Sequence, residues 1–155
     1  MNVGTASTLV VLVLLFPLLG SALNGFLGPV LGRRFVNIAG TVSIFAAFVV
    51  ACVVLVNVIG APVGHAFITV RLWDWIDLGG GTNLSVGMDF TLDALSALML
   101  MVITGVGFLI HVYSLGYMEH DTDFARFFGY MNFFIFSMLT LVLAADLVIL
   151  IFGCA

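Results

Sequence analysis

The sequence is poor in charged residues and contains no lysine. Charged side chains make up 8% of its 155 residues, whereas 63% of the residues are hydrophobic. A water-soluble domain has about 25% charged residues, so this composition excludes a soluble fold and places apolar surface against lipid. The few basic residues leave no cationic face for nucleic acid. We therefore predict an integral membrane protein, surrounded by lipid bilayer, that does not bind nucleic acid.

Cysteines and metal-ligand patterns are also scarce. The two cysteines, Cys52 and Cys154, match no metal or redox spacing. The short acidic stretch at 119–123 lacks the ligand spacing of a metal site and is typical of a solvated loop. We therefore predict no metal site in this chain, and we name no catalytic residue.

Long hydrophobic runs are abundant. A bilayer core of about 30 Å needs about 20 helical residues, because each residue adds about 1.5 Å to a helix. A helix also satisfies its own backbone hydrogen bonds, which hydrocarbon cannot do, so apolar runs of this length predict helices. The four predicted spans cover residues 8–30, 36–59, 94–115 and 127–143, and the predicted class is an all-α membrane protein.

The first run has two further features. No basic segment precedes it and it is longer than the apolar core of a signal peptide, so we interpret it as a retained span. Pro17 and Pro29 predict a kink or an early end of this helix, because proline removes a backbone donor and crowds the preceding turn.

The arginines predict how the chain is oriented. Arg33 and Arg34 lie between the first two spans and Arg126 lies just before the fourth, whereas Arg71 falls on the opposite side. Because loops rich in Lys and Arg stay in the cytoplasm, we expect the N-terminus outside and the long second loop outside. The predicted location is the cell inner (plasma) membrane.

The external loop, residues 60–93, changes its period. Residues 84–93 alternate between apolar and polar over ten positions, and residues 68–73 alternate in the same way. The glycine-rich stretch 79–83 between them is typical of a turn. We therefore predict an extracytoplasmic β-hairpin between the second and third spans, with Trp73 and Trp75 at the membrane–water boundary.

A fifth apolar segment follows the fourth span. Residues 127–152 as one helix would be about 39 Å long and would hold Asp146 inside the membrane. A turn at Asp146 avoids that burial, which costs about 2.5–3.5 kcal/mol. Residues 147–155 then form the start of a fifth helix whose last carbonyls lack partners. This pattern predicts an incomplete sequence.

Several stretches of this sequence resemble a known family. The matching residues are 88–96, 102–114, 116–118, 126–134 and 143–147, with a weaker local match at 16–20. Together they resemble the large antiporter-like subunit of respiratory complex I, called subunit L in bacteria. By this resemblance residues 1–155 form the N-terminal part of an antiporter-like membrane domain.

The resemblance implies a subunit of a proton-translocating NADH:quinone oxidoreductase. In that family this subunit holds no redox centre and moves protons through buried charged residues, whereas NAD, FMN, iron–sulfur clusters and quinone belong to partner subunits. The other membrane subunits of complex I are its expected partners. Family members also have an external hairpin after the second span. Whether the chain counts as part of an enzyme stays open at this point.

The resemblance also predicts a missing group. In the family a Trp-Glu pair follows a glycine of the fifth span, and that glutamate handles protons. Here Gly153 is followed by Cys154 and Ala155. We therefore expect that this chain alone does not pump protons.

Three residues are candidates for a proton path: His111, Asp146 and Asp93. A histidine side chain ordinarily titrates near neutral pH, and His111 lies within a span, although hydrogen bonding at the interface is an equal alternative. For Asp93 and Asp146 we favour the alternative that each caps the start of a helix, where a carboxylate accepts from free backbone N–H groups.

Two other functions compete with the complex I subunit. The A subunit of a multisubunit cation/proton antiporter has a similar N-terminal region, and neighbouring genes would separate the two. The third hypothesis is a membrane fragment without function.

Overall fold

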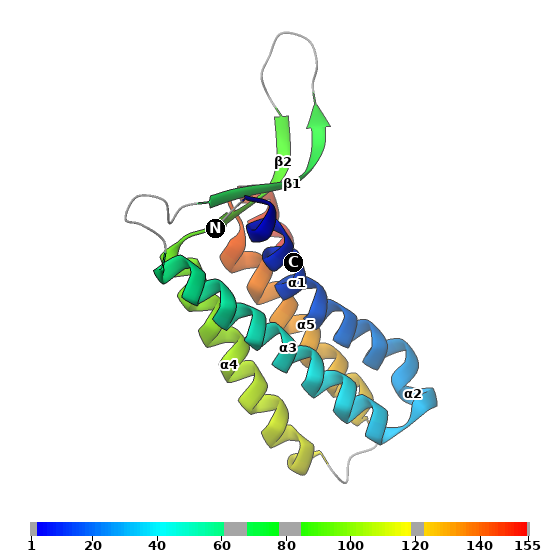
Figure 1. Ribbon diagram of the computed structural model, residues 1–155. Helices are drawn as coiled ribbons and strands as arrows, with labels where there is room; N and C mark the ends of the chain where they lie inside the picture. The colour runs from blue at the N-terminus through cyan, green and yellow to red at the C-terminus, as the bar shows by residue number, and fades with distance from the viewer. Residues whose placement is uncertain (1–2, 61–67, 78–84, 119–122, 155) are drawn as a thin grey trace.

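The computed structural model describes residues 3–60, 68–77, 85–118 and 123–154. Within these residues the chain forms long helices, short helical turns and one pair of strands (Figure 1). In chain order the elements are α1 (Val3–Ala22), the π-helical turn η1 (Leu23–Leu27), α2 (Gly28–Leu31), α3 (Arg33–Ile59), β1 (Ile68–Asp77), β2 (Ser85–Leu92), α4 (Ala94–Tyr117), α5 (Phe124–Leu143) and α6 (Leu147–Cys154).

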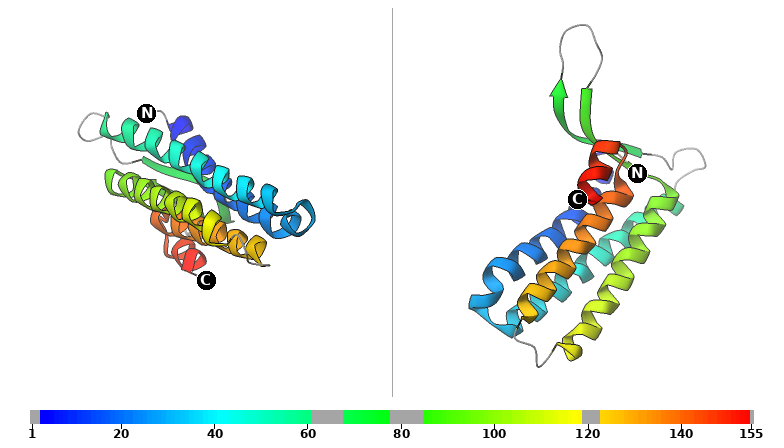
Figure 2. Two further views of the ribbon diagram at one scale, coloured as in Figure 1. Left: turned by 90° about the horizontal axis from the view of Figure 1, so that it is seen from below. Right: turned by 180° about the vertical axis from the view of Figure 1, so that it is seen from behind.

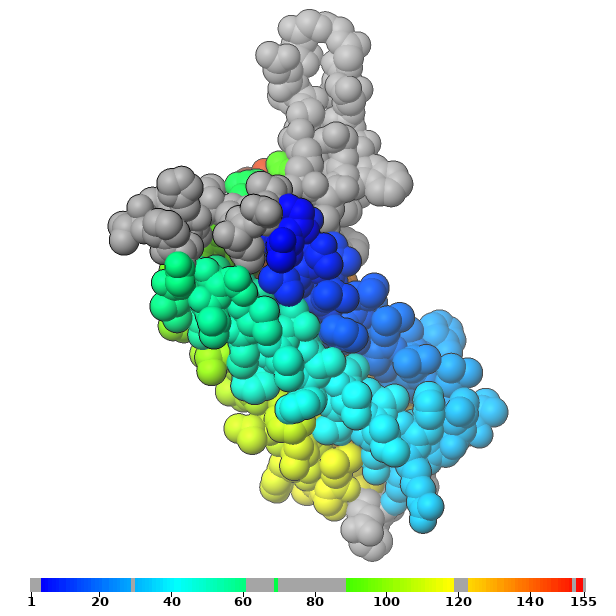
Figure 3. Space-filling model, in the orientation of Figure 1, coloured from blue at the N-terminus to red at the C-terminus, as the bar shows by residue number. Residues whose placement is uncertain are grey.

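The helices α1, α3, α4 and α5 form an antiparallel bundle. Helix α3 packs against α1 on one side and α4 on the other, and α5 packs against α1 and α4. The N-terminus, the strands and α6 lie at one end of the bundle, and α2 and the end of α4 lie at the other (Figures 1 and 2). In the orientation of Figure 3, the visible side of the bundle is formed mainly by α1 and α3.

Four helical segments of the described chain are long and apolar enough to cross a membrane, as predicted. They are Gly4–Leu27, Arg33–Ile59, Ala94–Tyr117 and Phe124–Leu143. The predicted spans 36–59, 94–115 and 127–143 lie within these segments, whereas the predicted first span, 8–30, ends three residues beyond Leu27. Arg126, placed before the fourth span in the sequence, thus lies inside α5, 3.8 Å from the carboxylate of Asp123.

The first helix continues past Pro17. Helix α1 runs to Ala22, and the regular helix then changes into the π-helical turn η1, between the two prolines from which a kink or an early end was predicted. Pro29 lies in the first turn of α2, a position that proline commonly occupies. The chain then turns at Gly32, whose φ of 84° lies in the left-handed region that glycine adopts without strain.

Strands β1 and β2 are antiparallel neighbours. Ile68 pairs with Leu92 and Asp77 pairs with Ser85, with two irregularities of register between these ends. Phe90 and Leu92 are buried and the residues beside them are partly exposed, so the predicted alternation is seen at 89–93. The predicted turn at 79–83 and the side chains of Trp73 and Trp75 lie outside the described residues.

The strands also contact the end of α5. The backbone N–H of Ala145 donates to the carbonyl of Asp89 at 3.0 Å, and Phe90 forms an isolated bridge with Ala144. The chain therefore leaves the helical conformation between Leu143 and Leu147, which confirms the turn predicted at Asp146. Helix α6 then packs back against α5, where Gly153 approaches the backbone of Leu141 and Ser137.

The apolar core lies along the bundle axis. It is made of small and branched side chains, including Val10, Val13, Ile44, Leu100 and Leu139. Large apolar side chains such as Phe26, which is 84% exposed, cover the outside. An apolar exterior is the arrangement expected where lipid replaces water as the surrounding medium.

Candidate functional site

A set of polar side chains lies inside the apolar bundle, near the end that carries α2. Asn24, His111 and Asn132 are 0%, 1% and 0% exposed, and Thr41 and Ser43 are partly buried. They come from four elements, η1, α3, α4 and α5. We call Asn24, Thr41, Ser43, His111 and Asn132 the polar layer.

His111 is held by its own helix. Its Nδ1 lies 2.8 Å from the carbonyl oxygen of Gly107, one turn earlier in α4. A carbonyl only accepts hydrogen bonds, so Nδ1 carries a hydrogen and, in the neutral ring, Nε2 carries the lone pair. Nε2 is buried and has no partner. The ring packs against Phe128 of α5, with centroids 5.6 Å apart.

His111 is buried between helices. It is 1% exposed, and its hydrogen bond is to the carbonyl of Gly107 in its own helix. Among the buried side chains of the described residues, His111 is the one whose ordinary pKa lies near neutral pH. It can therefore accept a proton at Nε2 while Nδ1–H stays bonded to Gly107.

Asn24 lies on the π-helical turn η1. Both its Nδ2 and its Oδ1 are buried without a partner. Leaving a polar group unsatisfied inside a protein costs about 1–3 kcal/mol. Single π-helical turns occur frequently at functional sites. Asn24 thus places two hydrogen-bonding groups without a partner inside the bundle. We call such unpartnered buried atoms open.

Asn132 is satisfied by two neighbours. Its Nδ2 donates to the carbonyl of Phe128 at 2.9 Å, and its Oδ1 accepts from Ser43 Oγ at 3.0 Å. Ser43 Oγ also lies 2.8 Å from the carbonyl oxygen of Gly40. The side chains of Ser43 and Asn132 therefore link α3 to α5.

Gly40 brings Asn24 close to Asn132. A Cβ atom at Gly40 would lie 2.8 Å from Asn24 Nδ2 and 3.3 Å from Asn132 Nδ2. The same point is 3.2 Å from Cδ1 of Phe128, whose ring contacts His111. Glycine at position 40 thus leaves room for the two amides.

Thr41 lies at the level of His111. Helices α3 and α4 are antiparallel, with Phe48 against Gly105 and Phe45 against Phe108. Extended by about one turn, this pairing predicts that residue 41 of α3 lies level with residue 112 of α4, next to His111. Thr41 Oγ1 is buried and has no partner. Two open atoms, one on each helix, therefore lie at this level.

Other buried hydroxyls are satisfied within their own helices. Thr104 Oγ1 donates to the carbonyl of Leu100 at 2.6 Å, and Thr140 Oγ1 donates to that of Phe136 at 2.9 Å. Such bonds are the usual way in which a hydroxyl is accommodated in an apolar helix. The open atoms of the polar layer depart from that pattern.

Asp93 caps α4, as the favoured interpretation predicted. Its Oδ1 accepts from the backbone N–H of Ser96 at 2.7 Å, and Ser96 Oγ accepts from the backbone N–H of Asp93 at 2.8 Å. This reciprocal pair is a capping box. Hydrogen bonding by the Ser96 side chain, and then by its backbone N–H, lowers the pKa of Asp93 below its ordinary value.

Asp146 directly precedes α6. Its backbone carbonyl accepts from the N–H of Leu150 at 3.1 Å, which begins the helix. The role of its carboxylate as a cap stays a prediction. Asp93 and Asp146 lie at the strand end of the bundle, whereas His111 is 18 residues, or about 27 Å, further along α4. The three candidates therefore do not form one site.

Most of the polar layer was missed by sequence reasoning. Thr41, Ser43 and Asn132 are neutral and isolated within apolar runs, so no motif marks them. The available signal was the presence of amides and hydroxyls inside spans, where polar groups are expensive.

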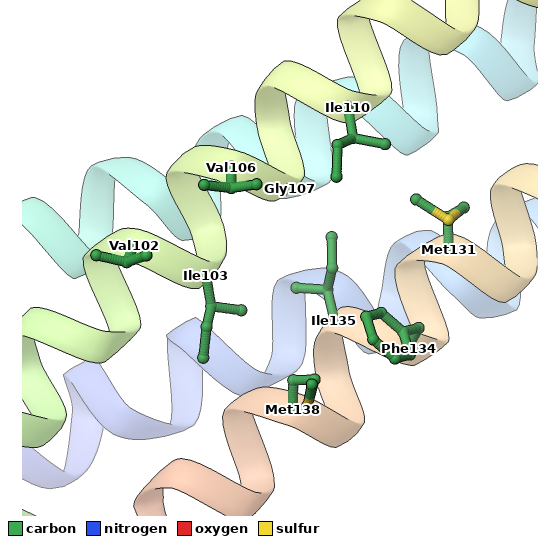
Figure 4. Close-up of a pocket in the computed structure, with 9 residues that line it drawn as sticks. All are labelled: Val102, Ile103, Val106, Gly107, Ile110, Met131, Phe134, Ile135 and Met138. Carbon is green, nitrogen blue, oxygen red and sulfur yellow. The ribbon is translucent and has the colours of Figure 1, made fainter.

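An apolar pocket lies between α4 and α5 on their outer side. It has a volume of about 240 Å³ and is lined by Val102, Ile103, Val106, Gly107, Ile110, Met131, Phe134, Ile135 and Met138 (Figure 4). Binding sites for small polar molecules have a few convergent polar groups, and this lining has none. The pocket therefore adds no chemistry to the polar layer.

No group of three or more metal-ligating side chains occurs among the described residues. Arg126 and Asp123 form an exposed ion pair, with 3.8 Å between Nη1 and Oδ1. Chemistry inside this part of the bundle is therefore limited to amides, hydroxyls and one imidazole.

The apolar helices and their buried polar layer define an integral, multi-pass membrane protein. Its residues 75–128 match the family model described as "NADH-Ubiquinone oxidoreductase (complex I), chain 5 N-terminus". That range contains Asp93 and His111 but not Asp146.

Curated relatives extend the match to nearly the whole chain. It is 40% identical over 146 residues to NADH-quinone oxidoreductase subunit L of Pseudomonas aeruginosa, with 92% of this chain and 23% of the relative covered. For subunit L of Mycobacterium tuberculosis (strain H37Rv) the identity is 39% over 145 residues, and for that of Escherichia coli (strain K12) it is 36% over 143 residues. These two alignments each cover 92% of this chain and 22% of the relative.

The resemblance to subunit L is thereby confirmed. The chain is similar to an N-terminal portion of these relatives and spans about a fifth of their length.

Proposed function

We propose that this chain forms the N-terminal part of a membrane subunit of a proton-translocating NADH:quinone oxidoreductase. Its contribution is to proton transport that is coupled to electron transfer. The observation that carries the proposal is His111, which lies within the matched range 75–128 and presents a buried, unpartnered Nε2. A buried titratable group within a span is a functional candidate by default.

His111 is suited to exchange a proton. The Gly107 carbonyl fixes the tautomer, so a proton that arrives at the ring binds at Nε2. Binding turns a neutral ring into a cation inside the bundle, which is favourable only for as long as nearby dipoles or charges compensate. The amides and hydroxyls of the polar layer supply such dipoles. His111 is therefore the residue of this chain that we assign to the proton path.

The two aspartates have a different role in this proposal. Asp93 is engaged in its capping box, and its lowered pKa keeps it ionised at neutral pH. An ionised carboxylate with its hydrogen-bonding groups engaged is a poor proton carrier. Asp93 and Asp146 thus mark the strand end of the bundle. We place this end at the outer side of the membrane.

The proposal also covers the orientation of the chain, its partners and the location of the cofactors. We place the N-terminus and the paired strands outside the cell and the junctions at Arg34 and Arg126 in the cytoplasm, in the inner (plasma) membrane. The N-terminus and strands share one end of the bundle, which agrees with this orientation (Figure 1). The partners are the other membrane subunits of complex I. We assign NAD, FMN, iron–sulfur clusters and quinone to partner subunits.

A chimera tests the proposal. The matching segment of Escherichia coli subunit L is replaced by residues 3–154 of this chain, and membrane vesicles are assayed for NADH-driven proton pumping. We expect an assembled complex that pumps and that loses pumping when His111 is replaced by Gln. A matched control is Tyr113→Phe, because Tyr113 lies on the exposed face of the same helix.

Other outcomes separate the competing functions. A chimera that assembles and reduces quinone, but pumps equally with and without His111, contradicts the role of His111. Cation/proton exchange that does not depend on NADH would favour the antiporter subunit, and failure of the segment to assemble would favour a fragment without function.

A further inference from the structure

We propose that the polar layer is a built water site, in which bound water joins Nε2 of His111 to Thr41 and to the amide of Asn24. The site itself stands on the geometry of the bundle. It rests on the proposed function only in one respect, namely that the water would deliver a proton to His111.

The first argument is the pattern of open groups. Four buried side-chain atoms of the described residues have no partner: Asn24 Nδ2, Asn24 Oδ1, Thr41 Oγ1 and His111 Nε2. All four belong to the polar layer, whereas the buried hydroxyls of Thr104 and Thr140 are satisfied within their own helices. Open polar atoms gathered in one place predict a ligand that satisfies them together.

The second argument is the chemistry of these atoms. Nδ2 of Asn24 donates, Oδ1 of Asn24 and Nε2 of His111 accept, and the Thr41 hydroxyl does both. Water donates two hydrogen bonds and accepts two, so it matches this mixed set. A metal cation would meet only the acceptors, and no carboxylate lies among the buried polar side chains of the described residues.

The third argument is placement. Asn24 Nδ2 lies beside Gly40, and Thr41 follows directly on the same helix at the level of His111. The ring of Phe128 lies beside Gly40 and packs on His111, so it connects these two positions. From these contacts we infer that the unpartnered atoms lie near one short stretch of α3. Buried water typically makes about three hydrogen bonds in a polar setting of this kind.

Glycine at position 40 preserves this setting. An added Cβ would lie 2.8 Å from Asn24 Nδ2, closer than side chains tolerate. The added methyl group would then occupy the space beside the Asn24 amide. The space therefore depends on both a glycine and an asparagine.

Solid-state NMR on the full chain in lipid nanodiscs tests the site directly. With ¹⁵N-labelled histidine, polarisation transfer from water protons to the ring nitrogens is measured, and the His111 signals are assigned by their loss in His111→Gln. We expect clear transfer from water to Nε2 of His111. Absence of transfer in the unmodified chain overturns the proposal.

A matched pair of variants locates the water. Asn24→Leu replaces the open amide by an apolar side chain of similar size and is expected to reduce the transfer at least severalfold. Asn57→Leu makes the same chemical change at an exposed asparagine of α3 that bonds Val53, and should leave the transfer unchanged. Equal transfer in both variants overturns the proposal.

A second variant guards against misfolding. If Asn24→Leu fails to insert, as judged by circular dichroism, Thr41→Val serves in its place, because it removes only the hydroxyl. If Thr41→Val leaves the transfer from water to His111 Nε2 unchanged and raises the Tm, the polar layer holds no water at Thr41, and the proposal is overturned. Normal hydration combined with unaffected pumping in His111→Gln leaves the water site standing and contradicts the proposed function alone.

Discussion

Ser43 and Asn132 are 89 positions apart in the sequence and are joined by a hydrogen bond of 3.0 Å. The bond connects α3 to α5 inside an apolar bundle. Lipid provides no hydrophobic force between helices, so such polar contacts and close packing help to hold the helices together. This contact belongs to the same layer as His111 and links the stability of the bundle to its candidate site.

Loss of the Ser43 hydroxyl should destabilise the bundle. In Ser43→Ala the Oδ1 atom of buried Asn132 loses its donor, and an unsatisfied buried acceptor costs about 1–3 kcal/mol. Thermal unfolding in nanodiscs measures the effect. Ser137→Ala is the control, because its exposed hydroxyl bonds only its own helix, at Phe133. Equal Tm values for the two variants would contradict the importance of the cross-helix bond.

Replacement of His111 should affect pumping more than electron transfer. In the chimeric complex, His111→Ala is expected to lower proton pumping severalfold while NADH:quinone reduction and assembly stay near normal. The reason is that the imidazole of His111 is the group assigned to accept the proton, whereas redox chemistry is assigned to partner subunits. Pumping and quinone reduction are measured in the same vesicles. Parallel loss of assembly would indicate a packing role for His111.

The cap at Asp93 should make α4 sensitive to acid. Replacement of an N-cap by alanine costs about 0.5–2 kcal/mol. Because the folded pKa is lower than the unfolded one, the stabilisation from Asp93 is present above the unfolded pKa and is lost as pH falls through the folded pKa. The decline is therefore expected below about pH 4.

Asp93→Asn checks this linkage. Asparagine also caps helices but does not titrate, so the variant should keep most of the stability at pH 7 and lose the part of the acid sensitivity that belongs to Asp93. Unfolding is followed from pH 7 to pH 3. An unchanged acid profile in Asp93→Asn would refute the assignment.

Cysteine labelling should show which side of the membrane each end of the bundle faces. With Cys52 and Cys154 replaced by alanine, a single cysteine at Gly80 is expected to react with an impermeant reagent from outside intact cells. The counterpart is Gly116→Cys at the end of α4, where an added Cβ meets no atom within 4 Å. The cysteine of Gly116→Cys should react only after the membrane has been permeabilised. The reverse pattern would refute the proposed topology.

The spans and the cap were predictable because their causes are local. A run of apolar residues needs only the bilayer to become a helix, and a capping box needs only Asp93 and Ser96, three positions apart. The turn at Asp146 follows in the same way from the cost of one carboxylate in hydrocarbon. The π-helical turn after Ala22 was not predictable, because proline signals mark a break without specifying its form.

The polar layer depended on the tertiary structure. In the sequence, each of its residues is a single polar group in an apolar helix. For His111 the sequence allowed both a proton-path role and hydrogen bonding at the interface. Whether an amide or imidazole is satisfied depends on which helix faces it and at what level, and this is set by packing between segments far apart in the chain. The sequence by itself determined the membrane class, the four spans and the capped start of α4, because each arises from contacts within a few residues or from the solvent. Only the tertiary structure decided that Asn24, Thr41 and His111 lie open in one layer, because that depends on the register of helices that meet across the bundle.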